Sequence, residues 1–537
     1  MNGGERPESL PGCTDEMNES ATETASPSPP GATPGGRGER RRAWWGGALA
    51  AGLALAVGEV AAGLLVEGAS LVGSVGDVVI DFSPSFVRDW AIDLLGTNDK
   101  PALVIGIVVV SLVAGGALGR LATTRPVPAA AAFAAFGVLG FFAGARQTEW
   151  DTVAAIVTAV LAALAGMAAL VVLTRLAAGA AEADGSRRGF LVGAGSVAGL
   201  TLFAVAGSRL LNAELRRQIA QSRDEVVLPE GIVEAAPPAQ PPPPVDGIAP
   251  LVTPNADFYR IDTALNVPRI DPVTWSLKVT GMVDREIELT YDDLLARDLI
   301  EHYVTLACVS NRVGGDLVGN ARWLGVPLAE ILDEAGVHDG ATQVVGRAVD
   351  GFTVGFPTAV ALDGRVAMVA VGMNDEALPF THGFPARLIV AGLYGYVSAT
   401  KWLAEIELTT LEAFDAYWVP RGWAKEAPIK TQSRIDVPGG DVAAGRQAIA
   451  GVAWAPHRGI SRVEVRIDEE DWREAELGEQ LTEDAWVQWW TEWDAQPGSH
   501  RIAVRATDGT GETQPEERLP ARPDGATGHH TISVTVG

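Results

Sequence analysis

The stretch Val304-Thr305-Leu306-Ala307-Cys308-Val309-Ser310-Asn311-Arg312 contains one of only two cysteines in the chain. The other, Cys13, lies in an N-terminal tail rich in Ser, Pro, Gly and Glu, which is predicted to be disordered. Cysteines so placed offer no disulfide framework. Cys308 is therefore either a small buried apolar residue, the more common case in proteins, or a metal ligand or reactive thiol.

The composition changes along the chain. At 537 residues the protein is too long for one ordinary core. Residues 43–211 are dominated by Ala, Val, Leu and Gly, whereas the sequence after Leu251 is mixed, acidic and rich in Trp. The net charge of -26 argues against nucleic acid as a partner.

The apolar half contains a series of runs that approach or exceed the roughly 20 residues needed to cross a bilayer. These runs are Ala43–Val66, Ala102–Leu121, Val127–Ala145, Thr152–Leu173 and Phe190–Leu211. They have no amphipathic periodicity, which favours membrane spans over buried core helices. All seven histidines lie at or beyond His302, so a bis-histidine haem within the membrane part of this chain is excluded.

Charges in the short loops predict the orientation of the spans. Basic residues precede the first run and occupy alternate loops: Arg37, Arg40, Arg41, Arg42, Arg120, Arg125, Arg175, Arg187 and Arg188. The loop from Glu67 to Lys100 instead holds six acids against Arg88 and Lys100. The N-terminus is therefore expected in the cytoplasm, and everything after Leu211 outside it.

The fifth run begins with Ser186-Arg187-Arg188-Gly189-Phe190-Leu191, which resembles a twin-arginine export signal. The alternative is that the paired arginines only obey the charge rule of the spans. An export signal here would mean that the downstream domain folds around a cofactor before it crosses. Glu59, inside the first run, is either a proton or quinone site or faces a neighbouring helix.

The exported half divides in two. A Pro-rich segment from Pro229 to Pro250 is expected to be an extended tether. Mixed strand-like and helix-like runs then predict an α+β domain. From about Gln432, short alternating strands predict a β-sandwich, with its tryptophans forming a core and an interface: Trp454, Trp472, Trp486, Trp489, Trp490 and Trp493.

A series of motifs follows in order from Thr253. They are Thr253-Pro254-Asn255, Asn266-Val267-Pro268, Trp275-Ser276-Leu277-Lys278-Val279-Thr280-Gly281, Thr305-Leu306-Ala307-Cys308 with Asn311, Ala321-Arg322-Trp323, His382-Gly383-Phe384-Pro385-Ala386-Arg387 and Lys401-Trp402-Leu403. Together they resemble the sulfite oxidase family of molybdopterin-dependent oxidoreductases. The tail from Gly451 onward resembles the immunoglobulin-like dimerisation domain of that family.

The resemblance implies a molybdenum cofactor and assigns residues to it. The cysteine matching Cys308 is the protein ligand of molybdenum, which suits a lone soft thiolate, and Arg312 is a second candidate catalytic residue. The candidate cofactor-binding residues are Tyr259, Arg260, Asp262, Thr263, Asp350, His382, Arg387, Ser398, Thr400 and Lys401. Cations and polar loops are what a pterin phosphate requires.

The chain departs from sulfite oxidases at the anion pocket. Asp262, Thr263 and Ala264 stand where the family carries Arg-Asn-His, and Val354-Gly355 stands where it carries Tyr-Gly. The stretch Trp486–Trp490 lacks an expected arginine. A pocket with fewer cations binds a dianion such as sulfite poorly, so a neutral S- or N-oxide is the favoured substrate.

The resulting expectation is a multidomain chain with an all-α transmembrane anchor, an α+β sulfite-oxidase-like domain and an immunoglobulin-like β-sandwich. Its parts are a disordered tail (1–42), five spans (43–212), a linker (213–250), the molybdopterin domain (251–430) and the β-sandwich (431–537). Expected partners are membrane lipid, a small oxo-type substrate, a separate cytochrome or quinone-linked electron carrier, and a second copy as one option. The alternatives are sulfite oxidation in a rearranged pocket and a non-catalytic cell-surface binding protein.

Overall fold

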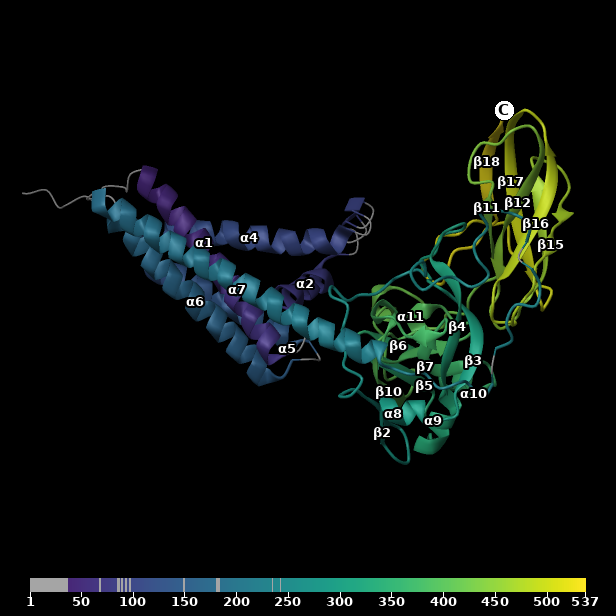
Figure 1. The fold of residues 1–537 in the computed structure, drawn as a ribbon, viewed down its shortest axis with the longest axis horizontal. Helices are drawn as coiled ribbons and strands as arrows, with labels where there is room; N and C mark the ends of the chain where they lie inside the picture. The colour runs from purple at the N-terminus through teal and green to yellow at the C-terminus, as the bar shows by residue number, and fades with distance from the viewer. Residues whose placement is uncertain are drawn as a thin grey trace, which may run out of the picture.

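The structure is a computed structural model that describes residues 37–537 except 67–68, 85–86, 88–89, 92–93, 96–97, 148–149, 180–183, 234 and 242. Most of the expected N-terminal tail, including Cys13, lies outside the described residues. Figure 1 shows a helical bundle, a central domain of sheets and short helices, and a C-terminal pair of sheets.

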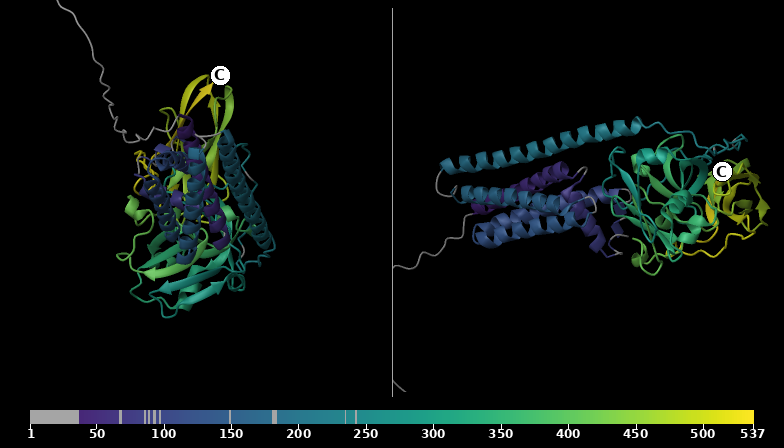
Figure 2. Two further views of the ribbon diagram at one scale, coloured as in Figure 1. Left: turned by 90° about the vertical axis from the view of Figure 1, so that its left-hand side faces the viewer. Right: turned by 90° about the horizontal axis from the view of Figure 1, so that it is seen from below.

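Within the part of the chain that the structure describes, five helices are long and apolar enough to cross a membrane, as the sequence predicts. They are α1 (Arg37–Leu65), α4 (Asp99–Ala122), α5 (Pro126–Ala145), α6 (Thr152–Gly179) and α7 (Asp184–Asp224). The short helix α2 (Leu71–Phe82) lies where the bundle meets the central domain (Figure 1). Figure 2 shows the long helices running roughly side by side.

Helix α7 is longer than the apolar run at its start. It continues to Asp224 and so includes residues that were expected to belong to the linker. The helix extends beyond its apolar run because the following residues are largely strong helix formers: Asn212-Ala213-Glu214-Leu215-Arg216-Arg217-Gln218-Ile219-Ala220-Gln221.

Glu59 supports a neighbouring helix. Its Oε1 accepts hydrogen bonds from Val72 N at 2.7 Å and from Ser70 Oγ at 3.2 Å. Ser70 is the N-cap of α2 and accepts from Gly73 N at 2.9 Å. Carboxylates stabilise helix N-termini because the first backbone N–H groups have no partner inside the helix. These contacts favour the interpretation in which Glu59 faces a helix neighbour.

Glycine allows α1 and α4 to touch along their backbones. A Cβ atom at Gly119 would clash with the carbonyl oxygen of Ala43, and a Cβ atom at Gly47 would clash with the carbonyl oxygen of Gly115. Small residues at a helix crossing let the two backbones pack closely, and this packing stabilises helix pairs in lipid, where the hydrophobic effect does not drive association. Gly106, on the same helix α4, has no atom within 4 Å of its Cβ position.

The central domain contains two five-stranded sheets. The first has the order β2-β1-β10-β5-β6, formed by β1 (Ser276–Gly281), β2 (Ile287–Thr290), β5 (Gln343–Ala348), β6 (Thr353–Pro357) and β10 (Leu403–Thr409). The second has the order β3-β4-β7-β8, with β9 also paired to β7. Its strands are β3 (Ile300–Ala307), β4 (Val318–Pro327), β7 (Ala367–Met373), β8 (Glu376–Ala377) and β9 (Arg387–Val390).

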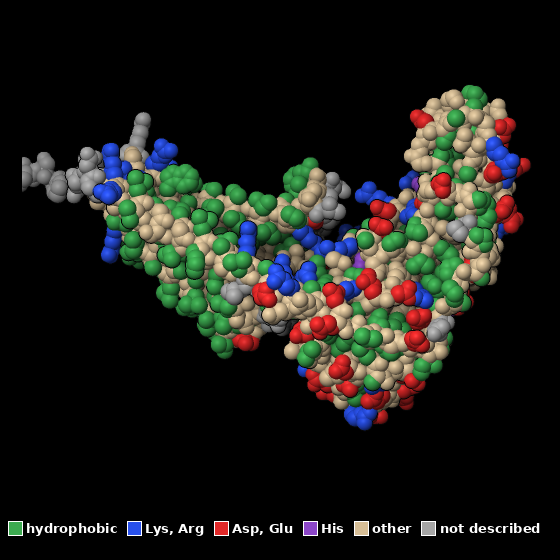
Figure 3. Space-filling view, viewed as in Figure 1, with side chains coloured by type: hydrophobic (Ala, Val, Ile, Leu, Met, Phe, Trp, Pro, Cys, Tyr) green, Lys and Arg blue, Asp and Glu red, His purple; other side chains and the backbone are tan. Residues whose placement is uncertain are grey.

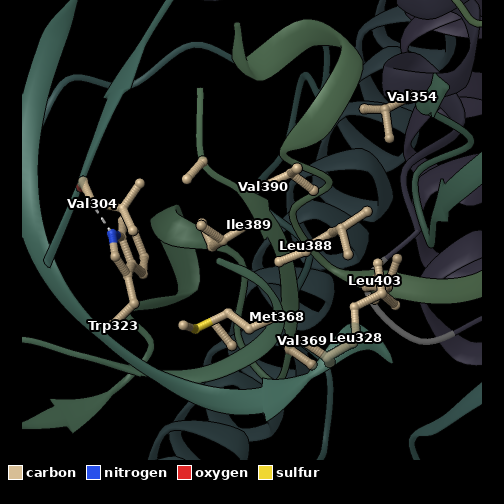
Figure 4. Packing of buried hydrophobic residues seen from close by; sticks show 14 of the residues in the cluster. Val304, Trp323, Leu328, Val354, Met368, Val369, Leu388, Ile389, Val390 and Leu403 are labelled. Carbon is tan, nitrogen blue, oxygen red and sulfur yellow. Dashed lines mark hydrogen bonds between the residues drawn. The ribbon is translucent and has the colours of Figure 1, made fainter. Parts of the chain in front are cut away.

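Short helices and a buried core complete this α+β domain. The helices are α8 (Tyr291–Leu295), α9 (Leu328–Ala335), α10 (Thr358–Leu362), α11 (Gly395–Ser398) and the 3-10 turns η2 (Phe380–His382) and η3 (Val419–Arg421). Figure 4 shows Met368, Val369, Leu388 and Ile389 packed in the core near Trp323. The Trp323 Nε1–H donates to Val304 O at 3.2 Å and so fixes the indole against β3.

The C-terminal region consists of two four-stranded sheets on a shared core. One has the order β11-β12-β16-β15, formed by β11 (Gln432–Val437), β12 (Gly445–Trp454), β15 (Glu476–Leu477) and β16 (Val487–Ala495). The other has the order β14-β13-β17-β18, formed by β13 (Ile460–Ile467), β14 (Arg473–Glu474), β17 (Gly498–Asp508) and β18 (His530–Val536). Two of the tryptophans, Trp489 and Trp493, belong to the core between these sheets, while Trp454 and Trp486 join the core of the central domain.

The Pro-rich segment is hydrogen-bonded to the central domain and to the C-terminal sheets. Ile232 N donates to Leu299 O and Glu301 N donates to Val233 O, both at 2.8 Å. Because β3 is the edge strand of its sheet, the segment covers backbone groups that would otherwise face solvent. Ala249 N also donates to Asp436 Oδ2 at 3.0 Å. Over these residues the segment that was expected to be an extended tether lies on the domain surface.

The contact between α1 and α4 gives a test of the bundle. Gly119→Val should lower the Tm of the helical signal in detergent, because overpacking costs about 1–3 kcal/mol and here the obstacle is backbone. Gly106→Val adds the same side chain to the same helix in open space and should leave the Tm within experimental error. Equal shifts for the two variants would contradict this packing.

Candidate active site

Cys308 begins the loop that leads from β3 to β4. Its N–H donates to Leu317 O at 2.9 Å and its carbonyl accepts from Asn311 N at 3.0 Å. Asn311 Oδ1 also accepts from Leu317 N at 3.1 Å, which closes the loop on itself. The thiol is half-buried, free and 2.9 Å from Ser310 Oγ. Burial raises its pKa, so the thiol is protonated at neutral pH.

A second segment, between η2 and β10, brings three candidate side chains together. Gly383 turns the chain with a φ of 110°, and a Cβ there would lie 2.9 Å from Lys401 Cα. Arg387 Nη1 donates to His382 O at 3.0 Å, and Lys401 Nζ donates to Thr381 O at 3.3 Å. This close approach explains why His382, Arg387 and Lys401 form one cluster.

Arg387 is a buried cation with no carboxylate beside it. It is only 5% exposed, and its guanidinium lies 4.9 Å from the centre of the Trp323 ring. Its Nε is buried without a hydrogen-bond partner. Among the described residues no carboxylate is within salt-bridge distance of it, and burial lowers its pKa to about 10. A buried charge without a partner is costly, so the arrangement favours an anion from outside the protein.

Asp262 is shared by three cations. Its carboxylate lies 2.8 Å from Lys401 Nζ, 3.0 Å from Arg260 Nε and 2.8 Å from Lys100 Nζ. Burial would raise the pKa of Asp262, but the two lysines outweigh it and hold the pKa well below its usual range. Burial lowers the pKa of Lys401 to about 8, although Asp262 opposes that shift.

His382 is a neutral hydrogen-bonding residue in this cluster. It is buried, and its Nε2 lies 2.9 Å from Asn255 O. Burial, followed by the charge of Arg387, lowers its pKa to about 4. A neutral ring that donates from Nε2 to a carbonyl keeps Nδ1 as an acceptor.

Tyr259 and Asp350 are two further residues that the resemblance assigned to the cofactor. Tyr259 is stacked on Phe258, with ring centroids 5.3 Å apart. Burial raises the pKa of Tyr259. A Cβ atom at Gly395 would lie 3.7 Å from Tyr259 Oη and 3.8 Å from Ala307 O, so the phenol lies beside the residue that precedes Cys308. Burial raises the pKa of Asp350 to about 6, and this carboxylate accepts from Phe352 N at 3.1 Å.

The other predicted residues are placed differently. The Ser398 hydroxyl donates to Leu393 O at 3.2 Å and Tyr394 O at 3.1 Å, which is a local backbone contact. Thr400 Oγ1 is buried without a partner and lies next to Gly346 of β5. Thr263 is half-buried beside Asp262, and Arg312 is exposed on the cysteine loop.

Two cations that sequence reasoning did not assign also reach this region. Lys100, from the bundle, contacts Asp262. Arg434, at the start of the C-terminal sheets, donates to Gly315 O at 3.0 Å and pairs with Asp436 at 2.6 Å. In the sequence, the only indication that Lys100 is unusual is that it is a basic residue in an acid-rich loop. No feature of the sequence indicated a role for Arg434.

These residues suit the group that the sequence implies. Arg387 has both an unpaired charge and an unpartnered N–H, which a phosphate oxygen satisfies. Cys308 offers the soft sulfur ligand that molybdenum takes.

Comparisons with known proteins agree with this chemistry. The family model described as Oxidoreductase molybdopterin binding domain matches residues 264–418. Mitochondrial sulfite oxidase of Mus musculus is 30% identical over 322 residues, which are 50% of this chain and 58% of that protein. The chain thus spans little more than half the length of that relative.

Two further likenesses cover more of the proteins concerned. The uncharacterized oxidoreductase YuiH of Bacillus subtilis is 33% identical over 159 residues, 29% of this chain and 77% of that protein. The solved sulfane dehydrogenase SoxCD from Paracoccus pantotrophus is 23% identical with a TM-score of 0.47, over 54% of this chain and 82% of that one. From the family model and the likeness to YuiH, the chain belongs to the sulfite oxidase family of molybdopterin-dependent oxidoreductases, and its cofactor is the molybdenum cofactor.

Proposed function

We propose that this chain is a membrane-bound molybdenum enzyme that transfers an oxygen atom outside the cytoplasm and reduces an S- or N-oxide. The observation that carries the site assignment is Arg387, a buried guanidinium without a carboxylate among the described residues. Arg387 lies against Trp323, whose ring contacts that of Phe258 with centroids 5.8 Å apart, and the neighbouring Tyr259 lies beside Ala307, which precedes Cys308. This chain of contacts supports one site for the anion and the metal.

The residues take distinct roles in this proposal. Arg387 and Lys401 hold the cofactor phosphate, and neutral His382 offers Nδ1 as an acceptor to a pterin edge. Cys308 would be the metal ligand; burial raises the pKa of its thiol, and the charge of a bound metal would be needed to hold it as the thiolate. When bound, the molybdenum cofactor supplies a two-electron redox centre that exchanges an oxygen atom with a small molecule. Reduction of an oxide consumes two electrons and two protons and releases water.

The charges around the cysteine loop favour a neutral substrate. Arg434 is paired with Asp436, and Arg260 shares Asp262 with the lysines. Few charges are then left to replace the hydration of a dianion. Sulfite oxidation is the second candidate, since Arg312 lies on the cysteine loop, Arg434 of β11 donates to Gly315 O of that loop, and the mouse relative is a sulfite oxidase.

The orientation of the bundle supports catalysis outside the cytoplasm. The end of the bundle near the central domain is formed by α2, the start of α4 and the end of α7. At the start of α4, Lys100 contacts Asp262, and at the end of α7, Arg223 Nε donates to Leu378 O at 2.9 Å. The arginines at the opposite helix ends, including Arg120, Arg125, Arg187 and Arg188, lie away from that domain, and Figure 3 shows basic side chains at the far end of the bundle. By the positive-inside rule that far end is cytoplasmic, with the twin-arginine motif located there.

We assign the division of the chain as tail (1–42), spans (43–212), linker (213–250), molybdopterin domain (251–430) and immunoglobulin-like domain (431–537), with the helical extension of α7 crossing the second boundary. The latter two are the catalytic and the dimerisation-type units. The bundle sequence contains no histidine, so electrons come from a separate cytochrome or quinone-linked protein.

Purified full-length chain should separate the candidate substrates. Chain made in a host that synthesises the cofactor should contain molybdenum and should reduce a methyl sulfoxide or an amine N-oxide with an artificial donor. Turnover of sulfite alone would replace the first candidate with the second, and molybdenum-free protein would contradict both.

Cys308→Ser should abolish turnover yet leave most of the molybdenum bound. The reason is that the phosphate and pterin contacts hold the cofactor independently of the one protein sulfur. Metal analysis and turnover measure the two effects. Cys13→Ser is the matched control and should retain both; a Cys308→Ser enzyme with normal turnover would refute the assignment.

The thiol of Cys308 should be slow to alkylate in cofactor-free protein carrying Cys13→Ser. Its raised pKa reduces the thiolate fraction at pH 7, and the rate should rise with pH further into the alkaline range than that of an ordinary thiol. Iodoacetamide labelling followed by mass spectrometry measures this rate. Rapid labelling at pH 7 would contradict the burial, and loading with cofactor should block labelling.

Arg387→Met should lower molybdenum content and raise the Tm of cofactor-free protein. The variant removes a buried charge that has no carboxylate partner among the described residues, a change worth about 1–4 kcal/mol for buried ionic groups. Arg458→Met is the contrast, because Arg458 pairs with the fully buried Asp508 at 2.9 Å and its loss should lower the Tm. A fall in Tm for both variants would argue against an uncompensated Arg387.

A further inference from the structure

Lys100, at the start of the second span, makes three hydrogen bonds to the candidate cofactor loop. Its Nζ donates to Asp262 Oδ1 at 2.8 Å, to Asp262 O at 3.1 Å and to Ala264 O at 2.6 Å. The Asp262 side chain is 3% exposed and that of Lys100 is 28% exposed. One ammonium group therefore fixes both a buried carboxylate and the backbone on each side of Thr263.

The bundle contacts the central domain at other points. A Cβ at Gly76 of α2 would lie 2.5 Å from Leu265 Cδ1, so the residue after Ala264 packs directly on that helix. Asp81, at the end of α2, lies 3.1 Å from Arg421 Nη2. Arg223 at the end of α7 pairs with Glu376 at 3.0 Å. Figure 3 shows basic side chains gathered where the bundle meets the central domain.

These contacts give the bundle a part in the cofactor site. We propose that Lys100 is a positioning residue that holds the loop of residues 259–264 in place through Asp262, so that the membrane bundle completes the cofactor site. The same carboxylate binds Lys401 at 2.8 Å, so Lys100 also fixes the position of a cofactor-binding cation. This inference rests on the proposed cofactor site and extends it to a residue of the bundle.

The geometry explains why a lysine from outside the domain is needed. Asp262 has two oxygens: Oδ2 receives Lys401 and Arg260, and Oδ1 receives Lys100. Without Lys100, one oxygen of a nearly buried carboxylate and two carbonyls lose their donor. A group left unsatisfied in that way costs free energy, and a loop that has lost such contacts opens more often.

Limited proteolysis of the full chain in detergent tests the loop directly. Trypsin cleaves after Arg260, which is exposed, and releases a peptide that begins at Ile261. Lys100→Met should raise the rate at which this peptide appears by about tenfold, because loop opening controls cleavage. Lys100→Arg preserves a cation and should restore a rate within about twofold of the unaltered chain. Lys278→Met, at an exposed lysine of β1, is the matched control.

Molybdenum retention after dialysis is the second readout. Lys100→Met should retain less molybdenum than the unaltered chain, and Lys100→Arg should retain about as much. Equal cleavage rates, or faster cleavage with full retention of molybdenum, would overturn the inference while leaving the proposed function intact. Absence of molybdenum from the unaltered chain would instead overturn the proposed function, and the cleavage rates would still report whether Lys100 holds the loop.

Discussion

The site depends on an imbalance of buried charge. Lys401 and Arg260 share a single carboxylate, Asp262, whereas Arg387 has no carboxylate beside it among the described residues. Burying a cation without an anion is unfavourable, and the fold accepts this cost where Trp323 stacks on the guanidinium. An anionic group with several acceptors removes the imbalance, which is why these residues suit the phosphate of the molybdenum cofactor.

One sheet positions both halves of that chemistry. Cys308 follows the end of β3, and Arg387 begins β9, and both strands belong to the sheet that β4 and β7 connect. The thiol and the guanidinium are therefore held by a hydrogen-bonded scaffold, with the turn at Gly383 bringing Lys401 alongside. The helical bundle adds to the site from outside the sheet, through Lys100.

The sequence was sufficient to predict features that depend on a continuous run of apolar residues or on a local motif. Long apolar runs predicted the five helices that are long and apolar enough to cross a membrane. The resemblance assigned His382 and Arg387 through the His-Gly-Phe-Pro segment and Lys401 through the Lys-Trp-Leu motif. The sequence could not predict contacts between distant residues: Lys100 meets Asp262 across 162 positions, and Arg434 meets Gly315 across 119. Helix propensity beyond the apolar run extended α7, and the edge of β3 captured the Pro-rich segment. Ser398 and Thr400 occupy motif positions, yet their hydroxyls lie next to backbone, because the same segment must also close a tight turn.

X-ray absorption at the molybdenum edge tests the central claim most directly. In purified full-length chain the sulfur shell around molybdenum should contain one more scatterer than in the Cys308→Ser protein, while the metal remains bound in both. The same sulfur count in the two proteins would contradict the assignment of Cys308 as the ligand and, with it, the site built around this thiol.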